Sequence, residues 1–146
     1  SVVLSGRVAL AAAIPNIAFD AAVSRQPRVI AARIALRRDQ GRLGNDVVIH
    51  MGTNGRVNEE DLRPILESLR DRRRVVVVDV AVPRRWMAAS NRTIIKIARE
   101  FPNVRLADWR GISRGHRDYF VRDGVHLTRK GGSAFAAMVA KALSAP

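Results

Sequence analysis

Two residues near the C-terminal end have the types and spacing of an acid–base pair. Asp123 and His126 lie three residues apart in the stretch Asp123-Gly124-Val125-His126-Leu127-Thr128. A turn of this length can fold the carboxylate back so that it accepts a hydrogen bond from Nδ1 of the imidazole. That bond would fix the tautomer and leave Nε2 free to act as a base. The alternative is an ordinary capping turn with a surface histidine.

A second candidate is the stretch Met51-Gly52-Thr53-Asn54-Gly55, which directly follows an expected strand over Asp46–His50. The glycines allow a tight turn and a close approach of the backbone to a ligand. The side-chain amide of Asn54 can donate a hydrogen bond to an oxyanion that develops during acyl transfer. A plain turn is the other interpretation of this stretch.

Composition narrows the class of protein. The 146 residues fit one domain, and a hydrophobic fraction of 47% allows a packed core. The net charge of +13 suits a polyanionic partner, but only 5% of the residues are aromatic and no nucleic-acid-binding motif occurs, so we expect no nucleic-acid partner. Without cysteines, and with three histidines that lack metal-ligand spacing, the chain predicts neither a metal site nor a cofactor.

The elements that must position these residues alternate between strands and helices. Such alternation predicts a parallel sheet with right-handed crossovers, hence a three-layer α/β/α sandwich with a five-stranded parallel sheet. In open sheets of this kind, ligands bind beyond the carboxyl ends of the strands. The expected strands are Val2–Ser5, Ile17–Ala22, Asp46–His50, Val75–Val80 and Val104–Asp108, and the expected helices are Val8–Ala13, Pro27–Arg38, Leu62–Leu69, Trp86–Phe101 and Thr128–Leu143.

Taken together, these motifs resemble the SGNH hydrolase family, whose signature is a serine, a glycine, an asparagine and an Asp-x-x-His in that order. The resemblance implies a flavodoxin-like strand order. It is stronger to the extracytoplasmic branch, the C-terminal domains of membrane acyltransferases that O-acetylate peptidoglycan or related glycans. The segments that carry it are Asp20–Gln26, Val47–Gly55, Val75–Pro83, Asn103–Trp109, Gly115-His116 and Asp123–Lys130.

The resemblance implies a role for each matching residue. His126 would be the general base, Asp123 its orienting partner and Asn54 an oxyanion-hole donor. Ser24 stands where the family has its second-block glycine, and its backbone N–H could still serve, as could that of Gly6. Arg25, near the expected mouth of the site, either binds an anionic group of the substrate or covers the edge of the sheet.

The nucleophile is the residue that the sequence does not show plainly. The family places Gly-Asp-Ser at the end of the first strand, whereas this chain has Leu4-Ser5-Gly6-Arg7. Gly6 and Asp20 are 14 residues apart. We expect about 20 residues for a strand end, a full helix and the next strand. One hypothesis is therefore that a segment with the nucleophile is missing between Gly6 and Arg7; the others are a domain that lacks a nucleophile, and Ser5 as a displaced one.

Two functions follow from these alternatives. The first is a serine O-acyltransferase or esterase that acts through an acyl-enzyme, with an acyl donor and a cell-envelope glycan as partners. The second is a catalytically inactive module that binds an anionic envelope polymer or a partner protein. For either function, the resemblance implies that residues 1–146 form a single domain of a larger polypeptide, tethered outside the cytoplasm by a membrane-embedded acyltransferase domain.

Overall fold

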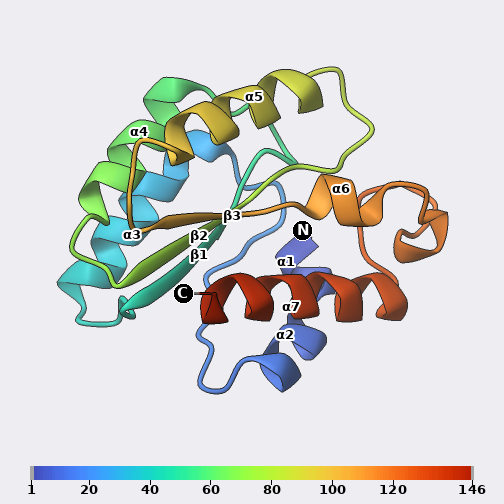
Figure 1. Cartoon of the computed structure of the whole chain (residues 1–146), viewed down its shortest axis with the longest axis horizontal. Helices are drawn as coiled ribbons and strands as arrows, with labels where there is room; N and C mark the ends of the chain where they lie inside the picture. Colours follow the sequence, from blue (N-terminus) through green and yellow to red (C-terminus); the bar gives the residue numbers. More distant parts are fainter. Residues whose placement is uncertain (1, 146) are drawn as a thin grey trace.

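A small parallel sheet forms the centre of the computed structural model, which describes residues 2–145 (Figure 1). Its strands are β1 (Asp46–His50), β2 (Arg74–Val78) and β3 (Val104–Ala107), in the order β1-β2-β3. Val48 of β1 lies opposite Val76 of β2 in the register. These are the third, fourth and fifth of the expected strands, and each is confirmed within a few residues.

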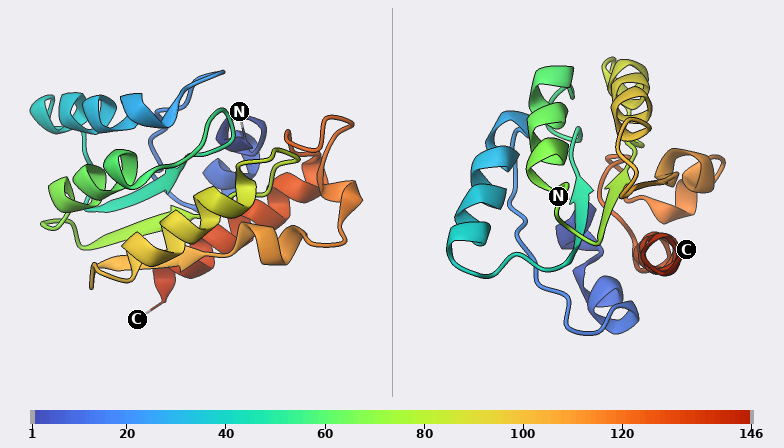
Figure 2. Two further views of the ribbon diagram at one scale, coloured as in Figure 1. Left: turned by 90° about the horizontal axis from the view of Figure 1, so that it is seen from above. Right: turned by 60° about the vertical axis from the view of Figure 1, so that its left-hand side comes forward.

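Helices cover both faces of the sheet, so the three-layer arrangement is confirmed. Helices α3, α4 and α5 lie together on one side, and α2 and α7 lie on the other (Figures 1 and 2). No helix among the described residues is both long enough and apolar enough to cross a membrane. The bounds are α1 Val2–Ser5, α2 Arg7–Ala13, η1 Pro27–Val29, α3 Ile30–Asp39, α4 Glu59–Ser68, α5 Met87–Ala98, α6 Trp109–Ser113, η2 Arg117–Tyr119 and α7 Arg129–Ser144.

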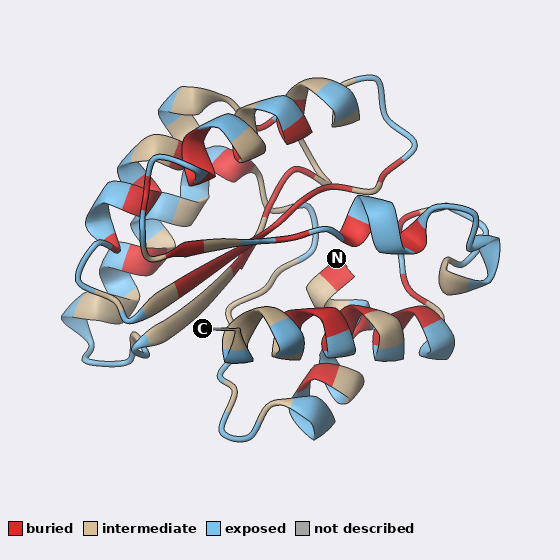
Figure 3. Cartoon of the chain, in the orientation of Figure 1, coloured by how far each residue is buried: buried red, intermediate tan, exposed pale blue. Residues whose placement is uncertain are grey.

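The core is densest around β2. All residues of Val75–Val78 are 0% exposed, which explains why a continuous run of valines is tolerated there (Figure 3). The apolar stripe of α4, with Leu62 and Leu66, packs into the same core. Asn58 and Asp61 form a capping box at the start of α4, where the Asn58 N–H donates to Asp61 Oδ2 over 3.1 Å.

The prediction of a first strand over Val2–Ser5 is wrong, because these residues form helix α1. Helical hydrogen bonding continues through Gly6: its N–H donates to the Val2 carbonyl over 3.0 Å, and the Leu10 N–H donates to the Gly6 carbonyl over 2.9 Å. The β propensity of two valines is a weak preference, and burial of Val2 inside the helical arrangement outweighs it. The backbone at Gly6–Arg7 is therefore helical, and nothing in it marks a missing segment.

The second expected strand, Ile17–Ala22, is also absent from the described sheet, which has three strands instead of five. This segment is extended but pairs with no strand. It belongs to the connection that runs from α2 on one face to α3 on the other, past the outer edge of β1 (Figure 1). An extended backbone becomes a strand only when a neighbour takes up its hydrogen bonds, and here there is none.

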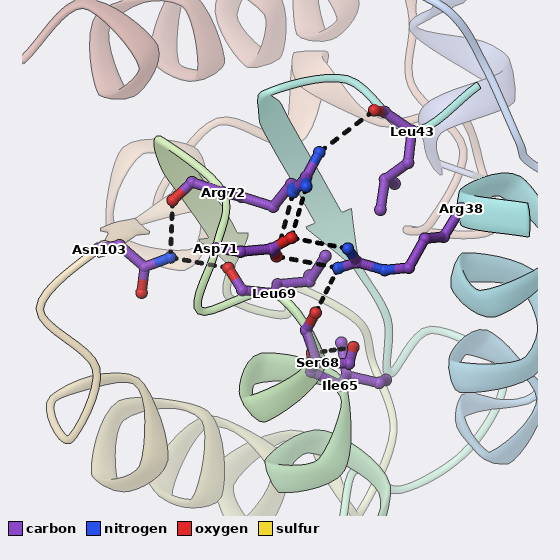
Figure 4. A network of polar contacts seen from close by, with 8 residues as sticks. All are labelled: Arg38, Leu43, Ile65, Ser68, Leu69, Asp71, Arg72 and Asn103. Carbon is purple, nitrogen blue, oxygen red and sulfur yellow. Dashed lines mark hydrogen bonds and ion pairs between the residues drawn. The ribbon is translucent and has the colours of Figure 1, made fainter. Parts of the chain in front are cut away.

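The run Arg72-Arg73-Arg74 is held by ion pairs and carbonyl contacts. Arg72 pairs with Asp71, as Figure 4 shows, Arg73 pairs with Asp46, and Arg74 donates to the carbonyl of Leu143. These contacts lie at the amino ends of the strands, away from the carboxyl ends where ligands are expected. These arginines therefore link β2 and the turn before it to β1 and to the end of α7.

Candidate functional site

The Asp123–His126 pair has the geometry that the spacing predicts. His126 Nδ1 lies 2.6 Å from Asp123 Oδ2. The other carboxylate oxygen accepts the N–H of Val125 over 2.8 Å and that of His126 over 3.0 Å. The hydrogen bond to the imidazole, followed by those two backbone bonds, lowers the pKa of Asp123 to about 2. The carboxylate is therefore ionised at neutral pH, and the ring Nε2 has no partner among residues 2–145.

A hairpin-like loop presents this pair. Phe120 and Leu127 form an antiparallel bridge, and the Val121 N–H donates to the His126 carbonyl over 2.9 Å. At its tip Gly124 has φ +70°, and a Cβ there would lie 3.2 Å from Pro83 Cγ. The loop with the base thus packs against the segment that follows β2.

The loop after β1 is tied to that same segment. Gly52 has φ +105°, and a Cβ on it would lie only 2.6 Å from Val80 Cγ2, so the close approach requires glycine. The Gly52 carbonyl accepts the Nε1–H of Trp86 over 2.9 Å. Two residues further on, the Asn54 side chain makes no hydrogen bond to any described residue, and its amide is free to donate.

Ser24 adopts the backbone conformation of a glycine. Its φ is +56°, in the left-handed region that side chains disfavour, which accounts for the family's glycine at this position. Its loop lies against the loop after β1, because a Cβ on Gly55 would be 2.5 Å from Gln26 Oε1. The backbone N–H of Ser24 makes no hydrogen bond within the described residues.

The contacts join these loops into one rim at the carboxyl ends of the strands. In order of contact, the rim consists of residues 24–27, 52–55, 83–86 and 123–127. The sequence predicted site residues in the first, second and fourth of these segments. It missed the positioning role of Trp86, because an indole that donates to a carbonyl in another loop leaves no local pattern. No group of three or more metal-ligating side chains occurs among residues 2–145.

Ser5 and Gly6 make hydrogen bonds within the N-terminal helices and to the loop that carries His126. The Ser5 hydroxyl donates to the Val2 carbonyl over 2.9 Å and accepts the N–H of Leu127 over 3.0 Å. Both contacts are with backbone groups, and no hydrogen bond joins Ser5 to the His126 ring in the described structure. The Gly6 N–H is committed to the helix, so it is not available as an oxyanion donor.

Arg25 is bound to the extended segment that precedes it, and neither of its two expected roles is tested by these contacts. Its guanidinium lies 2.7 Å from Asp20 Oδ1 and donates to the Asp20 carbonyl over 2.8 Å. Arg33 and Arg37 of α3 also bind this carboxylate, over 3.0 and 3.1 Å. Partial burial disfavours the ionised form, but the three arginines outweigh it and hold the pKa of Asp20 well below its usual range.

The fold and the rim define an SGNH-type domain. No family model matches the chain. In structure, it resembles the C-terminal catalytic domain of the Streptococcus pneumoniae peptidoglycan O-acetyltransferase OatA (TM-score 0.86, 23% identity, 98% of this chain and 88% of that one). It also resembles a putative GDSL-like lipase from Parabacteroides merdae (TM-score 0.67, 19% identity, 96% and 77% of the two chains). At these identities, the two likenesses show the fold.

Sequence comparison narrows the class. The chain is 34% identical over 144 residues to the peptidoglycan O-acetyltransferase OatA of Listeria monocytogenes. The matched region covers 99% of this chain and 23% of that protein. The chain therefore belongs to the SGNH-type domain family of the peptidoglycan O-acetyltransferases. It spans about a fifth of the length of the curated relatives that it matches.

Proposed function

We propose that this domain transfers an acyl group to hydroxyls of cell-wall glycan through a serine acyl-enzyme. The observation that carries the proposal is the 2.6 Å contact between His126 Nδ1 and Asp123, which leaves Nε2 unpartnered on the rim that also bears Asn54. An oriented imidazole beside free amide donors suits the formation and breakdown of a tetrahedral acyl intermediate. The family relationship supports O-acetylation of peptidoglycan as the reaction.

We assign the nucleophile to Ser1. The family's serine stands between the end of a strand and the start of a helix, and in this chain the helix begins at Val2. Ser1 is thus the residue directly before it, although it lies outside the residues that the structure describes. Nineteen positions separate Ser1 from Asp20, close to the spacing of about 20 residues expected for a strand end, a full helix and the next strand. The bond from the Leu127 N–H to Ser5 supports this assignment, because it holds the first turn of the helix against the residue that follows His126.

Each step then has a group to perform it. The serine oxygen attacks the carbonyl carbon of the acyl donor while His126 Nε2 takes the serine proton. The Asn54 amide and the Ser24 N–H stabilise the oxyanion, and the leaving group departs with the proton from the imidazolium. A glycan hydroxyl next attacks the acyl-serine and gives its proton to His126. Collapse of the second intermediate returns that proton to the serine and releases the acylated glycan.

The larger setting is part of the same proposal. We assign residues 1–146 to one domain of a longer polypeptide whose membrane-embedded portion supplies the acyl donor on the outer side of the membrane. The relatives support this setting, because the chain matches about a fifth of their length. The glycan acceptor would reach the rim from the cell wall.

The test uses the domain preceded by the residues that come before Ser1 in the longer polypeptide. We expect it to hydrolyse p-nitrophenyl acetate, and His126→Ala to lower the rate by about 10²–10⁴. A sulfonyl fluoride should label the parent, and mass spectrometry should locate the adduct on Ser1. Ser5→Ala is the matched control, since it removes a hydroxyl four positions away and should leave the labelling in place.

Two results would overturn the proposal. Label on Ser5 would make that residue the nucleophile and show the assignment to Ser1 to be wrong. Full esterase activity in His126→Ala would remove the base from the mechanism. A parent that takes no label but binds peptidoglycan in a salt-sensitive manner would instead favour the inactive binding module.

A further inference from the structure

A small pocket lies between two segments of the rim, outside the residues that the proposed mechanism uses. Its volume is about 380 Å³. It comprises Arg56, which directly follows the rim segment 52–55, Arg85 and Trp86 from the rim segment 83–86, and Ala89 in the first turn of α5. We call it the arginine pocket. It adjoins the loop that carries Asn54, so a molecule bound at the rim can reach it.

The positive charge of the arginine pocket is not compensated within the described chain. Arg56 and Arg85 are exposed, as is most of the loop between β2 and α5 (Figure 3). Neither guanidinium makes a hydrogen bond or an ion pair with any of residues 2–145, and none of the described residues that line the pocket is acidic.

Other arginines near the same two helices are neutralised. Arg63 of α4, for example, binds both Glu59 and Glu100. Two guanidinium groups that line one pocket repel each other, and an anion between them replaces that repulsion with attraction to both. The arrangement therefore favours an anionic ligand.

The remaining wall of the pocket is rigid and apolar. The Nε1–H of Trp86 donates to the Gly52 carbonyl over 2.9 Å, and this bond fixes the indole between the two rim segments. Because the polar atom of the indole is already bound, the rest of the ring offers apolar surface. A flat apolar wall beside two cations suits a sugar ring that carries an anionic substituent.

We propose that the arginine pocket binds a carboxylate group carried by the glycan acceptor. The inference rests on the proposed function, which brings a glycan hydroxyl to the rim. A guanidinium binds a carboxylate through two parallel N–H···O bonds, so Arg56 and Arg85 hold the carboxylate while Trp86 lies against the adjoining sugar. The pocket then selects acceptors that carry a carboxylate close to the acylated hydroxyl over neutral glycans.

The test uses the longer domain of the esterase assay and two acceptors: a soluble peptidoglycan oligosaccharide with free carboxylates, and the same oligosaccharide after its carboxylates have been amidated. Acyl transfer from p-nitrophenyl acetate to each acceptor gives a ratio of kcat/KM values. For the parent, we expect the charged acceptor to be preferred by about 10-fold or more. In the double variant Arg56→Gln/Arg85→Gln, the ratio should fall close to one.

The matched control is the double variant Arg92→Gln/Arg99→Gln. It removes the same charge from two exposed positions of the chain that do not line the pocket. Its ratio should stay within about twofold of that of the parent, because exposed charges outside the site are screened by solvent and salt. Since each ratio compares two acceptors on one protein, a general loss of activity in a variant does not change it.

A ratio near one in the parent, or an unchanged ratio in Arg56→Gln/Arg85→Gln, would overturn the inference. Calorimetry with the 146-residue chain measures binding of the same two oligosaccharides without catalysis. Binding of poly(glycerol phosphate) through the two arginines, without binding of the charged oligosaccharide, would also overturn it. Ester hydrolysis without a preference for the charged acceptor would retain the proposed function and remove the carboxylate site. Selective binding by a chain that hydrolyses no ester would do the opposite.

Discussion

Strands β1 and β2 are neighbours with similar sequences, yet they lie in different surroundings. The four valines of Val75–Val78 are completely buried, whereas in Asp46–His50 Ile49 alone is classed as buried and the others are partly exposed. On the β2 side, helices cover both faces and the loops beyond the strand are joined by Trp86 and Pro83. On the β1 side, a cleft of about 550 Å³ lies beside the strand, and its lining includes Val3, Leu10 and Ile34.

The proposed catalytic residues fall on both sides of this difference. Asp123 and His126 belong to the β2 side, where the geometry of the base is already set. Ser24 and the start of α1 belong to the β1 side. We therefore expect changes near Asp123 and His126 to alter chemistry or stability directly, and changes in the partly exposed strand β1 to cost less stability than those in β2.

The largest effect should come from the orienting carboxylate. In the domain with its upstream stretch, Asp123→Asn keeps the shape of the side chain but removes the charge that fixes the His126 tautomer. We expect the esterase rate to fall by about 10³–10⁴, with little change in the melting temperature. Asp118→Asn, a carboxylate paired with Lys130 outside the proposed mechanism, is the control and should keep the rate within about threefold of the parent. Similar losses in both variants would contradict a specific role for Asp123.

The next effect is a pH dependence that originates at His50. Burial lowers its pKa to about 4 in the folded chain, compared with about 6.5 when unfolded. Between pH 6.5 and 4 the unfolded chain binds a proton at this ring and the folded chain does not. The free energy of unfolding should therefore fall, by up to about 3 kcal/mol, as the pH decreases from 6.5 toward 4. Urea unfolding of the parent and of His50→Gln, measured from pH 7 to 5, should show a steeper decline for the parent.

A buried carboxyl acts in the opposite direction, so only the difference between those two proteins is informative. Burial raises the pKa of Asp79 to about 6, and protonation of this group favours the folded chain as the pH falls. His116→Gln, which changes an exposed histidine, is the control and should follow the parent. Parallel curves for the parent and His50→Gln would show that His50 is not buried in the neutral form.

A matched pair of substitutions measures how much less β1 is buried than β2. Val48 and Val76 lie opposite each other in the register, but only Val76 is completely buried. In the 146-residue chain, we expect Val76→Ala to lower the free energy of unfolding by about 2–3 kcal/mol and Val48→Ala to lower it by about 1 kcal/mol or less. Equal losses of unfolding free energy in the two variants would show that Val48 is as well buried as Val76.

The smallest effect concerns backbone strain. Ser24 has φ +56°, so Ser24→Gly should stabilise the chain by about 0.5–1 kcal/mol, after the greater entropy of the unfolded glycine is subtracted. Ala22→Gly, at a position without positive φ, should destabilise it by a similar amount. Chemical denaturation of both variants checks the difference, and destabilisation by Ser24→Gly would argue against a strained backbone at this position.

Several parts of the molecule follow from local patterns of residues. The valine run at Val75–Val78 can only be buried, which fixed the central strand. The spacing of Asp123 and His126 within one turn fixed their hydrogen bond. The glycines around Asn54 fixed a tight loop. In each case the physical constraint acts between residues close together in the chain.

Other features depend on contacts between residues far apart in the chain. Whether Val2–Ser5 and Ile17–Ala22 become strands depends on a neighbouring backbone that takes up their hydrogen bonds. Packing makes the first segment a helix, and the second has no partner in the described sheet. The role of Ser5 likewise follows from its contact with Leu127, 122 positions away along the chain. Contacts over such separations are set by the packing of whole layers, which no local spacing encodes.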